Sequence, residues 1–326
     1  MGKLQLNQNI IVNFGVYAVE SPHMPVDQMC DRANLALESV KGQYFQRCAY
    51  YEDSMRLALA KEQELTNEMR PALKQRQFQI YLQPQVNHAT GALEGCEALV
   101  RWLHPQKGLI PPSDFIPVFE MNGFIAQLDE YVWEEACKTL RRWLGQGRAP
   151  VPISVNMSRL NIYNSDLCDR LCALLHKYGL PPELLRIEIT ESAYVENSVQ
   201  LIDVIERLQK IGFFIEMDDF GSGYSSLNTL KDVPFNLLKL DMKFLQGDHS
   251  ARSDRIISSI VRMARDLKLE VLAEGVETLE QADYLLNVGC PLVQGYYYSK
   301  PLPVPEFEAY WDNGDGRKAK SSGAKS

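Results

Sequence analysis

Acidic residues repeatedly follow short apolar runs in this chain, and this pattern constrains its fold more than any other feature. Each run has the length and composition of a buried strand. The acidic residues that end or follow the runs are Glu97, Glu188, Glu191, Asp218, Asp219, Glu274 and Glu277. Carboxylates gathered at one end of a parallel barrel repel one another unless a cation neutralises them. Because hard divalent cations take oxygen ligands, the pattern predicts a metal-dependent active site on a barrel.

From about residue 78 to about residue 311, β-rich runs alternate with amphipathic helical stretches. Strands are predicted over 79–85, 151–155, 185–189, 212–217, 237–240, 270–273 and 291–293, and helices over 127–144, 165–178, 198–210, 253–266 and 279–287. Such alternation over about 235 residues favours a (β/α)8 barrel. No helix precedes the run 92–102, so two early strands are expected to pair directly as a hairpin. The predicted fold class is α/β, a modified TIM (β/α)8 barrel with an antiparallel early strand.

The first 76 residues follow a different pattern. Residues 1–52 predict a strand (10–17), a helix (26–41) and a short strand (47–51), a unit too small for a self-sufficient core. Residues 53–76 predict a charged linker helix, and the heptads are too few for a coiled coil. The barrel domain is expected over 77–312. The Gly-, Ser- and Lys-rich residues 313–326 are expected to be a disordered tail.

The composition excludes several function classes. The chain has 326 residues, of which 45% are hydrophobic and 23% charged, as in an ordinary soluble globular protein. Its net charge of −8 argues against a nucleic-acid polymer as partner, although bound metals and a few cations could still attract a small anionic ligand. The seven cysteines suit neither a disulfide framework nor a zinc site. Without a signal peptide or an apolar span, the chain is expected in the cytoplasm without membrane contact, although a longer parent could be membrane-tethered.

Eight short motifs in a fixed order carry a resemblance to a known family. They are Gln83-Pro84, Glu97-Ala98-Leu99-Val100-Arg101-Trp102, Asn156-Met157-Ser158, Glu188-Ile189-Thr190-Glu191, Asp218-Asp219-Phe220-Gly221-Ser222-Gly223-Tyr224-Ser225-Ser226-Leu227, Lys239-Leu240-Asp241, Glu274-Gly275-Val276-Glu277, and Gln294-Gly295-Tyr296 followed by Lys300-Pro301. Together they resemble the EAL-domain phosphodiesterases, which hydrolyse cyclic di-GMP in bacteria. The resemblance covers residues 78–311, the whole predicted barrel.

The N-terminal strand-helix-strand resembles the C-terminal end of a GGDEF domain. The segment Asp31-Arg32-Ala33-Asn34-Leu35-Ala36-Leu37 carries this second resemblance. Asn34 stands where that family usually has Asp, which suggests a diverged domain. The Gly-Gly-Asp-Glu-Phe loop is absent from the chain, so no cyclase activity is expected.

The first resemblance implies a site that holds two Mg²⁺ or Mn²⁺ ions. Glu97, Asn156, Glu188 and Asp218 would hold the first ion, and Asp218 would bridge to the second, with Asp219 beside it. Glu274 is the candidate general base or water-orienting residue, and a ligand of the second ion is its competing role. Lys239 would point at the nucleophilic water or a phosphate oxygen, and Glu97 belongs to the catalytic set. The implied reaction opens one 3′-phosphoester bond of cyclic di-GMP and gives linear pGpG.

Substrate contacts are predicted for six further residues. Arg101 is placed to bind a phosphate, because a guanidinium matches phosphate geometry. Gln83 and Gln294 are expected to reach guanine or ribose edges, and Pro301 to offer an apolar face to a base. Leu99 and Asp241 complete the set, and the alternative for Asp241 is a structural role after its strand.

Two acidic residues and one loop are predicted to support the site. The Gly- and Ser-rich segment 219–231 resembles a family loop that is linked to dimerisation and metal affinity, with Glu191 as its anchor. Glu277 is expected to support the site or to start a helix. A homodimer through the barrel helices is the expected assembly.

Neighbouring residues receive structural interpretations. Glu94 is expected to be exposed, Trp102 to pack, and His104 to be structural. Glu216 is predicted on the outer face of the barrel. At least one of the three consecutive tyrosines at 296–298 is expected in the core.

Three functions compete. An active cyclic di-GMP phosphodiesterase is favoured, because every ligand position of the family is filled. A receptor that binds the nucleotide without hydrolysing it is the alternative. A third possibility is an unrelated TIM-barrel metal hydrolase, against which the number of ordered motifs argues.

Overall fold

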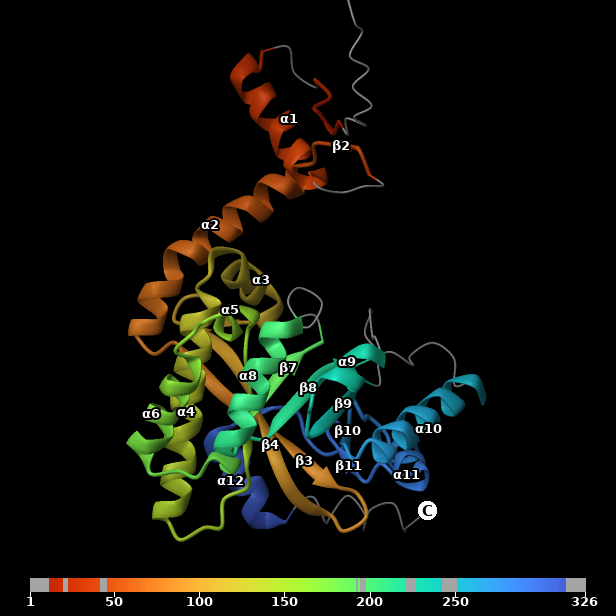
Figure 1. Cartoon of the computed structure of the whole chain (residues 1–326). Coiled ribbons are helices and arrows are strands. Elements are labelled where there is room, and N and C mark those ends of the chain that lie inside the picture. Colours follow the sequence, from red (N-terminus) through yellow and green to blue (C-terminus); the bar gives the residue numbers. More distant parts are fainter. Residues whose placement is uncertain are drawn as a thin grey trace, which may run out of the picture. The chain divides into compact units, whose positions relative to one another are not determined.

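The computed structural model describes residues 12–19, 23–41, 46–191, 193, 198–220, 227–241 and 251–314. The chain divides into two compact units, Met1–Arg70 and Pro71–Ser326. Figure 1 labels the helices and strands of both, coloured from red at the N-terminus to blue at the C-terminus. Of the predicted tail 313–326, residues 315–326 lie outside the described residues, and Asn313 is the last residue of a helix rather than part of a tail.

The first unit contains the predicted strand-helix-strand. Strand β1 (Phe14–Val16) pairs in parallel with β2 (Cys48–Tyr50), and helix α1 (Val26–Val40) connects them. Ala36, Val40 and Ala49 form its buried cluster. The predicted linker helix is observed as α2 (Asp53–Lys74), and the division between the two units falls inside it.

The second unit is built on a closed ring of eight strands. The ring consists of β3 (Phe78–Asn87), β4 (Ala92–His104), β6 (Ile153–Asn156), β7 (Leu185–Thr190), β8 (Ile215–Phe220), β9 (Leu237–Asp241), β10 (Glu270–Glu274) and β11 (Leu292–Val293). It closes because β3 pairs with both β4 and β11, antiparallel in each case. The predicted hairpin and the barrel with an antiparallel early strand are therefore confirmed. Two short strands, β5 (Gly108–Ile110) and β12 (Leu302–Pro303), extend β4 and β3.

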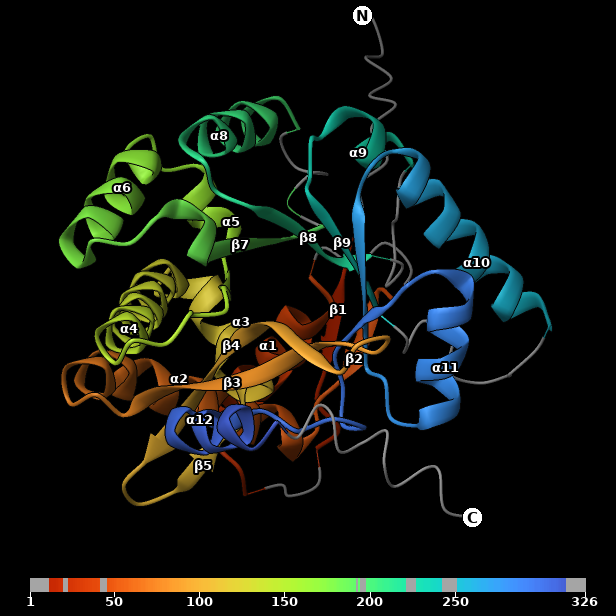
Figure 2. The same ribbon diagram turned by 90° about the horizontal axis from the view of Figure 1, so that it is seen from below.

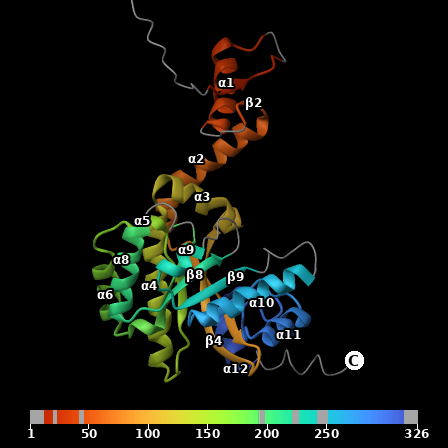
Figure 3. The same cartoon turned by 45° about the vertical axis from the view of Figure 1, so that its right-hand side comes forward.

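Helices surround the ring, as the view along the barrel in Figure 2 shows. They are α3 (Pro112–Asn122), α4 (Ile125–Gly145), α5 (Arg159–Ile162), α6 (Leu167–Tyr178), α8 (Ser198–Ile211), α9 (Leu227–Asp232), α10 (Ala251–Asp266), α11 (Leu279–Val288) and α12 (Val304–Asn313), with a 3-10 turn at Pro182–Leu184. Figure 3 shows α10 and α11 side by side at one flank of the barrel. The five predicted helices are observed, with ends that differ by a few residues.

Helix α3 is absent from the sequence prediction. Pro112 and Pro117 lie inside it, and prolines normally argue against a helix. Pro112 occupies the first turn, where its missing N–H costs nothing. The helix ends at Gly123, which adopts a left-handed conformation with φ of 78°.

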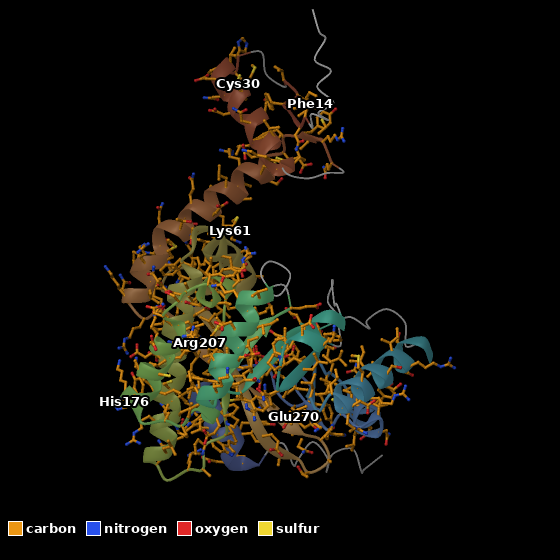
Figure 4. All side chains as sticks on the ribbon, viewed as in Figure 1. Phe14, Cys30, Lys61, His176, Arg207 and Glu270 are labelled. Atoms are coloured by element: carbon orange, nitrogen blue, oxygen red, sulfur yellow. The ribbon has the colours of Figure 1, made fainter. Side chains whose placement is uncertain are left out.

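The two faces of each barrel strand differ in polarity, because successive side chains of a strand point to opposite faces. The outer face packs apolar residues such as Ala98, Val155 and Met217 against the helices. The interior holds buried polar side chains: Gln83, Gln85, Glu97, Ser154, Glu188, Glu216, Asp218, Lys239 and Gln294. Figure 4 shows the solvent-facing side chains His176 and Arg207 on the covering helices α6 and α8.

The prediction that Glu216 faces outward is wrong. Glu216 is fully buried, and its carboxylate lies 3.3 Å from the Arg186 guanidinium on β7. Glu216 and Asp218 are two residues apart on one strand, so they share the interior face, whereas Met217 points to the helices. Three other structural interpretations are confirmed: Glu94 is exposed, Trp102 is buried, and the His104 ring accepts the backbone N–H of Lys107. None of the tyrosines at 296–298 is fully buried, although Tyr297 and Tyr298 pack against the core.

All seven cysteines are free thiols. Among the residues that the structure describes, none of the helices is both long enough and apolar enough to cross a membrane.

Candidate active site

A buried lysine surrounded by carboxylates lies at the carboxyl ends of the barrel strands. Lys239 on β9 is 1% exposed. Its Nζ lies 2.8 Å from Glu274 Oε1, 2.9 Å from Glu188 Oε1, 3.2 Å from Asp218 Oδ1 and 3.5 Å from Glu97 Oε2. Five different strands contribute to this cluster, so it exists only in the closed barrel. The predicted catalytic set of Glu97, Lys239 and Glu274 is brought together here.

Strand register brings the remaining polar residues to the same level of the barrel. Asn156 at the end of β6 lies opposite Glu188 on β7, and Asp241 at the end of β9 lies opposite Glu274 on β10. Parallel strands that end at one edge place their last side chains around a common mouth. The sequence spacing of these motifs therefore becomes spatial proximity once the barrel closes.

An irregularity in β8 allows two consecutive carboxylates to line the same cavity. Neighbouring residues of a regular strand point to opposite faces. The pairing of β8 with β9 shifts register between Met217 and Phe220, and Asp219 adopts a left-handed conformation with φ of 59°. Such bulges re-aim side chains next to active sites. The Asp219 backbone N–H donates to Asp218 Oδ1 at 2.9 Å, which fixes this turn.

The charges of the cluster perturb one another strongly. Burial lowers the pKa of Lys239, but the four surrounding carboxylates outweigh it and raise that pKa well above its usual value. Burial raises the pKa of Glu274 to about 8, although Lys239 opposes the shift. Burial, with the Glu97 charge, raises the pKa of Glu188 well above its usual value. Burial and the adjacent Asp218 raise the pKa of Asp219 to about 6.

The donor set fits a hard divalent cation. Carboxylates and one amide are the ligand types that Mg²⁺ and Mn²⁺ prefer. The Asn156 amide nitrogen lies 3.4 Å from Glu97 Oε1 and 3.2 Å from Glu188 Oε2. Within the described part of the chain, no group of three or more His, Cys, Asp or Glu side chains is arranged as a finished metal site. The Lys239 ammonium is the cation that lies between these carboxylates.

Two of the predicted substrate ligands belong to a buried glutamine network. Gln294 donates through Nε2 to Glu97 Oε2 and, at 3.3 Å, to Gln83 Oε1. Gln85 donates to Gln294 Oε1 at 3.2 Å, and Gln83 donates to the backbone oxygen of Ser299 at 3.3 Å. The network orients Glu97. Gln85 belongs to this network, although no sequence motif predicted a role for it. Strand alternation signals it, since Gln83 and Gln85 share one face.

The cluster opens into a cavity of about 330 Å³. Its lining includes the predicted site residues Gln83, Glu97, Leu99, Asp218, Asp219, Lys239, Asp241, Glu274, Glu277 and Gln294. Tyr296 also lines it and is 58% exposed, with Lys300 Nζ 5.3 Å from its ring centroid. Tyr298 has a structural role, because its hydroxyl hydrogen bonds to the buried His88 ring.

A second cavity of about 420 Å³ shares Leu99 with the first. Arg101 and Asn156 line this second cavity, together with residues of α3 and α4. The Arg101 guanidinium donates to the Val100 oxygen at 2.9 Å and lies over the Tyr81 ring. Pro301 lines neither of these two cavities.

The loop after β8 is described only in part. Residues 221–226 lie outside the described residues, so the predicted segment 219–231 is seen at Asp219, Phe220 and from Leu227 onward. Glu191 is buried, and its backbone N–H donates to the Asp218 oxygen at 3.3 Å. The predicted anchor therefore contacts the strand that carries the two aspartates.

Two loops approach closely beside the cavity, which Gly275 and Gly295 line. A Cβ on Gly295 would lie 2.1 Å from the Val276 backbone oxygen, so only glycine fits beside that loop. The Val276 N–H donates to the Gln294 oxygen at 3.2 Å. This contact holds the loop after Glu274 against β11.

Comparisons with known proteins agree on one family. The family model described as the EAL domain matches residues 66–301. The "Bifunctional diguanylate cyclase/cyclic di-GMP phosphodiesterase MucR" of Pseudomonas aeruginosa is 37% identical over 278 residues, which cover 85% of this chain and 41% of that protein. The "Cyclic di-GMP phosphodiesterase NbdA" of the same organism is 36% identical over 285 residues, 87% of this chain and 36% of that protein. The chain thus spans about two fifths of the length of these relatives.

A solved structure agrees with the sequence matches. The structure described as "PaMucR Phosphodiesterase, c-di-GMP complex" superimposes with a TM-score of 0.71 at 39% identity. The superposition covers 75% of this chain and 99% of that one.

Proposed function

Because this chain belongs to the EAL domain family, we propose that its barrel hydrolyses cyclic di-GMP to linear pGpG. The observation that carries the proposal is the cluster of Glu97, Glu188, Asp218 and Glu274 around Lys239. It lies beside an open cavity at the carboxyl end of the barrel, where TIM-barrel enzymes have their active sites. The related MucR protein, whose solved structure is a cyclic di-GMP complex, supports the choice of substrate.

We propose that two Mg²⁺ or Mn²⁺ ions are the cofactors. Glu97, Asn156, Glu188 and Asp218 would hold the first, and Asp218 and Asp219 the second. When bound, such ions polarise the phosphodiester and lower the pKa of the attacking water. The four carboxylates outnumber the single ammonium among them, so additional positive charge would stabilise the cluster.

Different side chains would have different roles in the reaction. Glu274 would accept a proton from the attacking water, since its carboxylate lines the cavity and lies 2.8 Å from Lys239 Nζ. Its competing role as a ligand of the second ion stays open. The water oxygen would bond to phosphorus while the bond to the ribose 3′ oxygen breaks, and that oxygen takes up a proton. Lys239 would direct its ammonium at the water or at a phosphate oxygen, which stabilises the charge of the transition state.

Substrate contacts follow from the two cavities. Arg101 would bind a phosphate, and Leu99 and Asp241 would contact the nucleotide within the cavity that they line. Gln83 and Gln294 would contact guanine or ribose edges while they orient Glu97. Pro301 would offer an apolar face to a base. Glu191 and Glu277 would support the loops that follow β8 and β10.

The proposal extends to domain organisation. Residues 1–52 would be the C-terminal part of a diverged GGDEF domain, 53–76 a linker helix, and 77–312 the EAL barrel. The parallel pairing of β1 with β2 across α1 is compatible with this assignment. A homodimer through the barrel helices is the proposed assembly, and light scattering after size-exclusion chromatography would measure it.

The decisive experiment is incubation of the purified chain with cyclic di-GMP and Mg²⁺ or Mn²⁺, followed by chromatography for pGpG. We expect pGpG to form, and we expect EDTA to stop its formation. Absence of pGpG would overturn the phosphodiesterase proposal. Tight nucleotide binding without turnover would indicate the receptor function instead.

A further inference from the structure

Helix α4, outside the strand ring, contacts the main chain next to the active site through two buried side chains. Asp129 is 7% exposed, and its Oδ2 accepts the Ser158 backbone N–H at 2.8 Å and Asn161 Nδ2 at 2.9 Å. Trp133, one helical turn later and 2% exposed, donates from Nε1 to the Asn156 backbone oxygen at 3.0 Å. The two side chains therefore hold both ends of the segment Asn156–Ser158.

Packing holds this segment only in part: Met157 lies in the buried core, whereas a cavity borders the side that faces α4. The cavity of about 420 Å³ lies between α4 and the segment, since Asp129 and Asn156 both line it. Beside open space, a main chain loses the dispersion contacts that hold a packed interior. The hydrogen bonds from α4 therefore add a directional restraint on this side. On the other side, the Met157 N–H donates to the Glu188 oxygen at 2.9 Å.

An ionised aspartate suits the position of Asp129. A carboxylate is an acceptor only, so a single oxygen can take both N–H groups. Burial raises the pKa of Asp129 to about 6, and the hydrogen bonds from Ser158 and Asn161 oppose that shift. Alanine at this position would leave the Ser158 N–H without its acceptor, whereas Asn161 Nδ2 would keep the Ala126 backbone oxygen at 3.3 Å.

The restrained segment carries a residue of the site. The Asn156 amide nitrogen lies 3.4 Å from Glu97 Oε1 and 3.2 Å from Glu188 Oε2. A displacement of its main chain by a fraction of an ångström would misdirect the amide. We propose that Asp129 and Trp133 are positioning residues, which act through Asn156 to set the geometry of the cation-binding carboxylates. This inference rests on the proposed function of the same site.

The test compares Mn²⁺ binding with turnover in the full chain. Asp129→Ala removes the acceptor, and Trp133→Phe removes the indole N–H while it keeps an aromatic ring. We expect each variant to bind Mn²⁺ about tenfold or more weakly by calorimetry, since residues that orient ligands contribute 10- to 100-fold to affinity. The kcat for cyclic di-GMP should fall in parallel, and KM should change less.

A double-mutant cycle separates positioning from general destabilisation. In an Asn156→Ala background, Asp129→Ala should change Mn²⁺ affinity by no more than about twofold. The reason is that Asp129 is proposed to act through the Asn156 side chain, which this background already lacks. Asp129→Asn keeps an acceptor oxygen and should recover part of the affinity. If Asp129→Ala does not fold, Trp133→Phe and its own cycle with Asn156→Ala carry the test.

Thr139→Val is the matched control. Thr139 lies on the same helix and is also buried, but its hydroxyl donates only within α4, to the Glu135 oxygen at 3.0 Å. We expect this variant to keep wild-type Mn²⁺ affinity and kcat. Wild-type Mn²⁺ affinity in Asp129→Ala or Trp133→Phe, or an equal loss with and without Asn156, would overturn the inference. A wild-type chain that binds Mn²⁺ but makes no pGpG would overturn the proposed function. The Mn²⁺ affinities of the variants would still test the positioning role of Asp129 and Trp133.

Discussion

Two cations in the barrel interior, the buried Lys239 and the partly exposed Arg186, have different surroundings. Lys239 lies within 3.5 Å of four carboxylates, on β4, β7, β8 and β10. Arg186, nearer the amino end of β7, pairs with the one carboxylate of Glu216 at 3.3 Å and lies over the Phe214 ring. The Arg186 pair is balanced in charge, whereas the Lys239 cluster is not. A balanced buried pair is a structural feature, and an excess of buried carboxylates indicates a site that binds protons or cations.

The two regions are adjacent along the strands. Glu188 and Glu216 are register partners on β7 and β8. Burial raises the pKa of Glu216, and Arg186 opposes that shift. The same strand pair therefore carries the Arg186–Glu216 ion pair nearer its amino end and carboxylates of the Lys239 cluster nearer its carboxyl end. Substitutions in each region should separate stability from catalysis.

The largest effect is expected from the carboxylates of the Lys239 cluster. Glu97→Ala or Asp218→Ala should abolish turnover, with a loss of at least about a thousandfold in kcat, because one preorganised polar group alone contributes 10² to 10³. Initial rates of pGpG formation would measure it. Glu94→Ala, an exposed position on the same strand as Glu97, is the control and should keep wild-type rates. Normal rates in Glu97→Ala or Asp218→Ala would contradict the metal assignment.

Replacement of the ammonium should impair catalysis more than binding. Lys239→Ala is expected to lower kcat by about a hundredfold or more, with a modest loss of cyclic di-GMP affinity, because a charge aimed at the reacting phosphate acts mainly in the transition state. Steady-state kinetics and calorimetry with the nucleotide would measure the two effects. A loss of affinity as large as the loss of kcat would assign Lys239 to substrate binding.

The balanced pair should affect stability instead. Arg186→Met is expected to lower the free energy of unfolding by about 3–5 kcal/mol, because it leaves Glu216 as an uncompensated buried carboxylate. Urea unfolding would measure the loss, and Arg186→Met with Glu216→Gln should recover part of it. The kcat of the folded variant should stay close to the wild-type value. A loss of kcat like that of Lys239→Ala would mean that the two regions act as one network.

The smallest effect concerns pH. Burial raises the pKa of Glu274 to about 8 and that of Asp219 to about 6 in the folded protein, so the folded state holds protons that the unfolded chain releases. The stability that these protons contribute is complete below the unfolded values near 4, and it is lost as pH rises through 6 and 8. In EDTA, the melting temperature should be a few degrees higher at pH 6 than at pH 8. Glu274→Gln should reduce that difference in melting temperature. A wild-type melting temperature that is equal at the two pH values, or higher at pH 8, would refute the proposed excess of buried carboxylates.

Local patterns in the sequence predicted most of the fold. Strand and helix periods repeat over a few residues, so the alternation after residue 78 predicted the barrel, and the missing helix before residue 92 predicted the β3–β4 hairpin. Helix α3 was missed because its two prolines imitate a loop. The outward orientation predicted for Glu216 was wrong because strand alternation was misapplied. Residues 216 and 218 of one strand share a face, so the sequence alone was enough to predict that Glu216 points inward.

The sequence by itself determined that Glu97, Glu188, Asp218 and Glu274 belong to different strands of one barrel, and hence that their carboxylates meet. Only the tertiary structure decided that Lys239 lies at their centre, that Asp219 lines the same cavity through a left-handed backbone, and that Asp129 contacts Ser158 from α4. The physical reason is the separation in sequence of the residues that interact. Periodicity is a property of adjacent residues, whereas these distances depend on ring closure and on a register shift that no local pattern encodes.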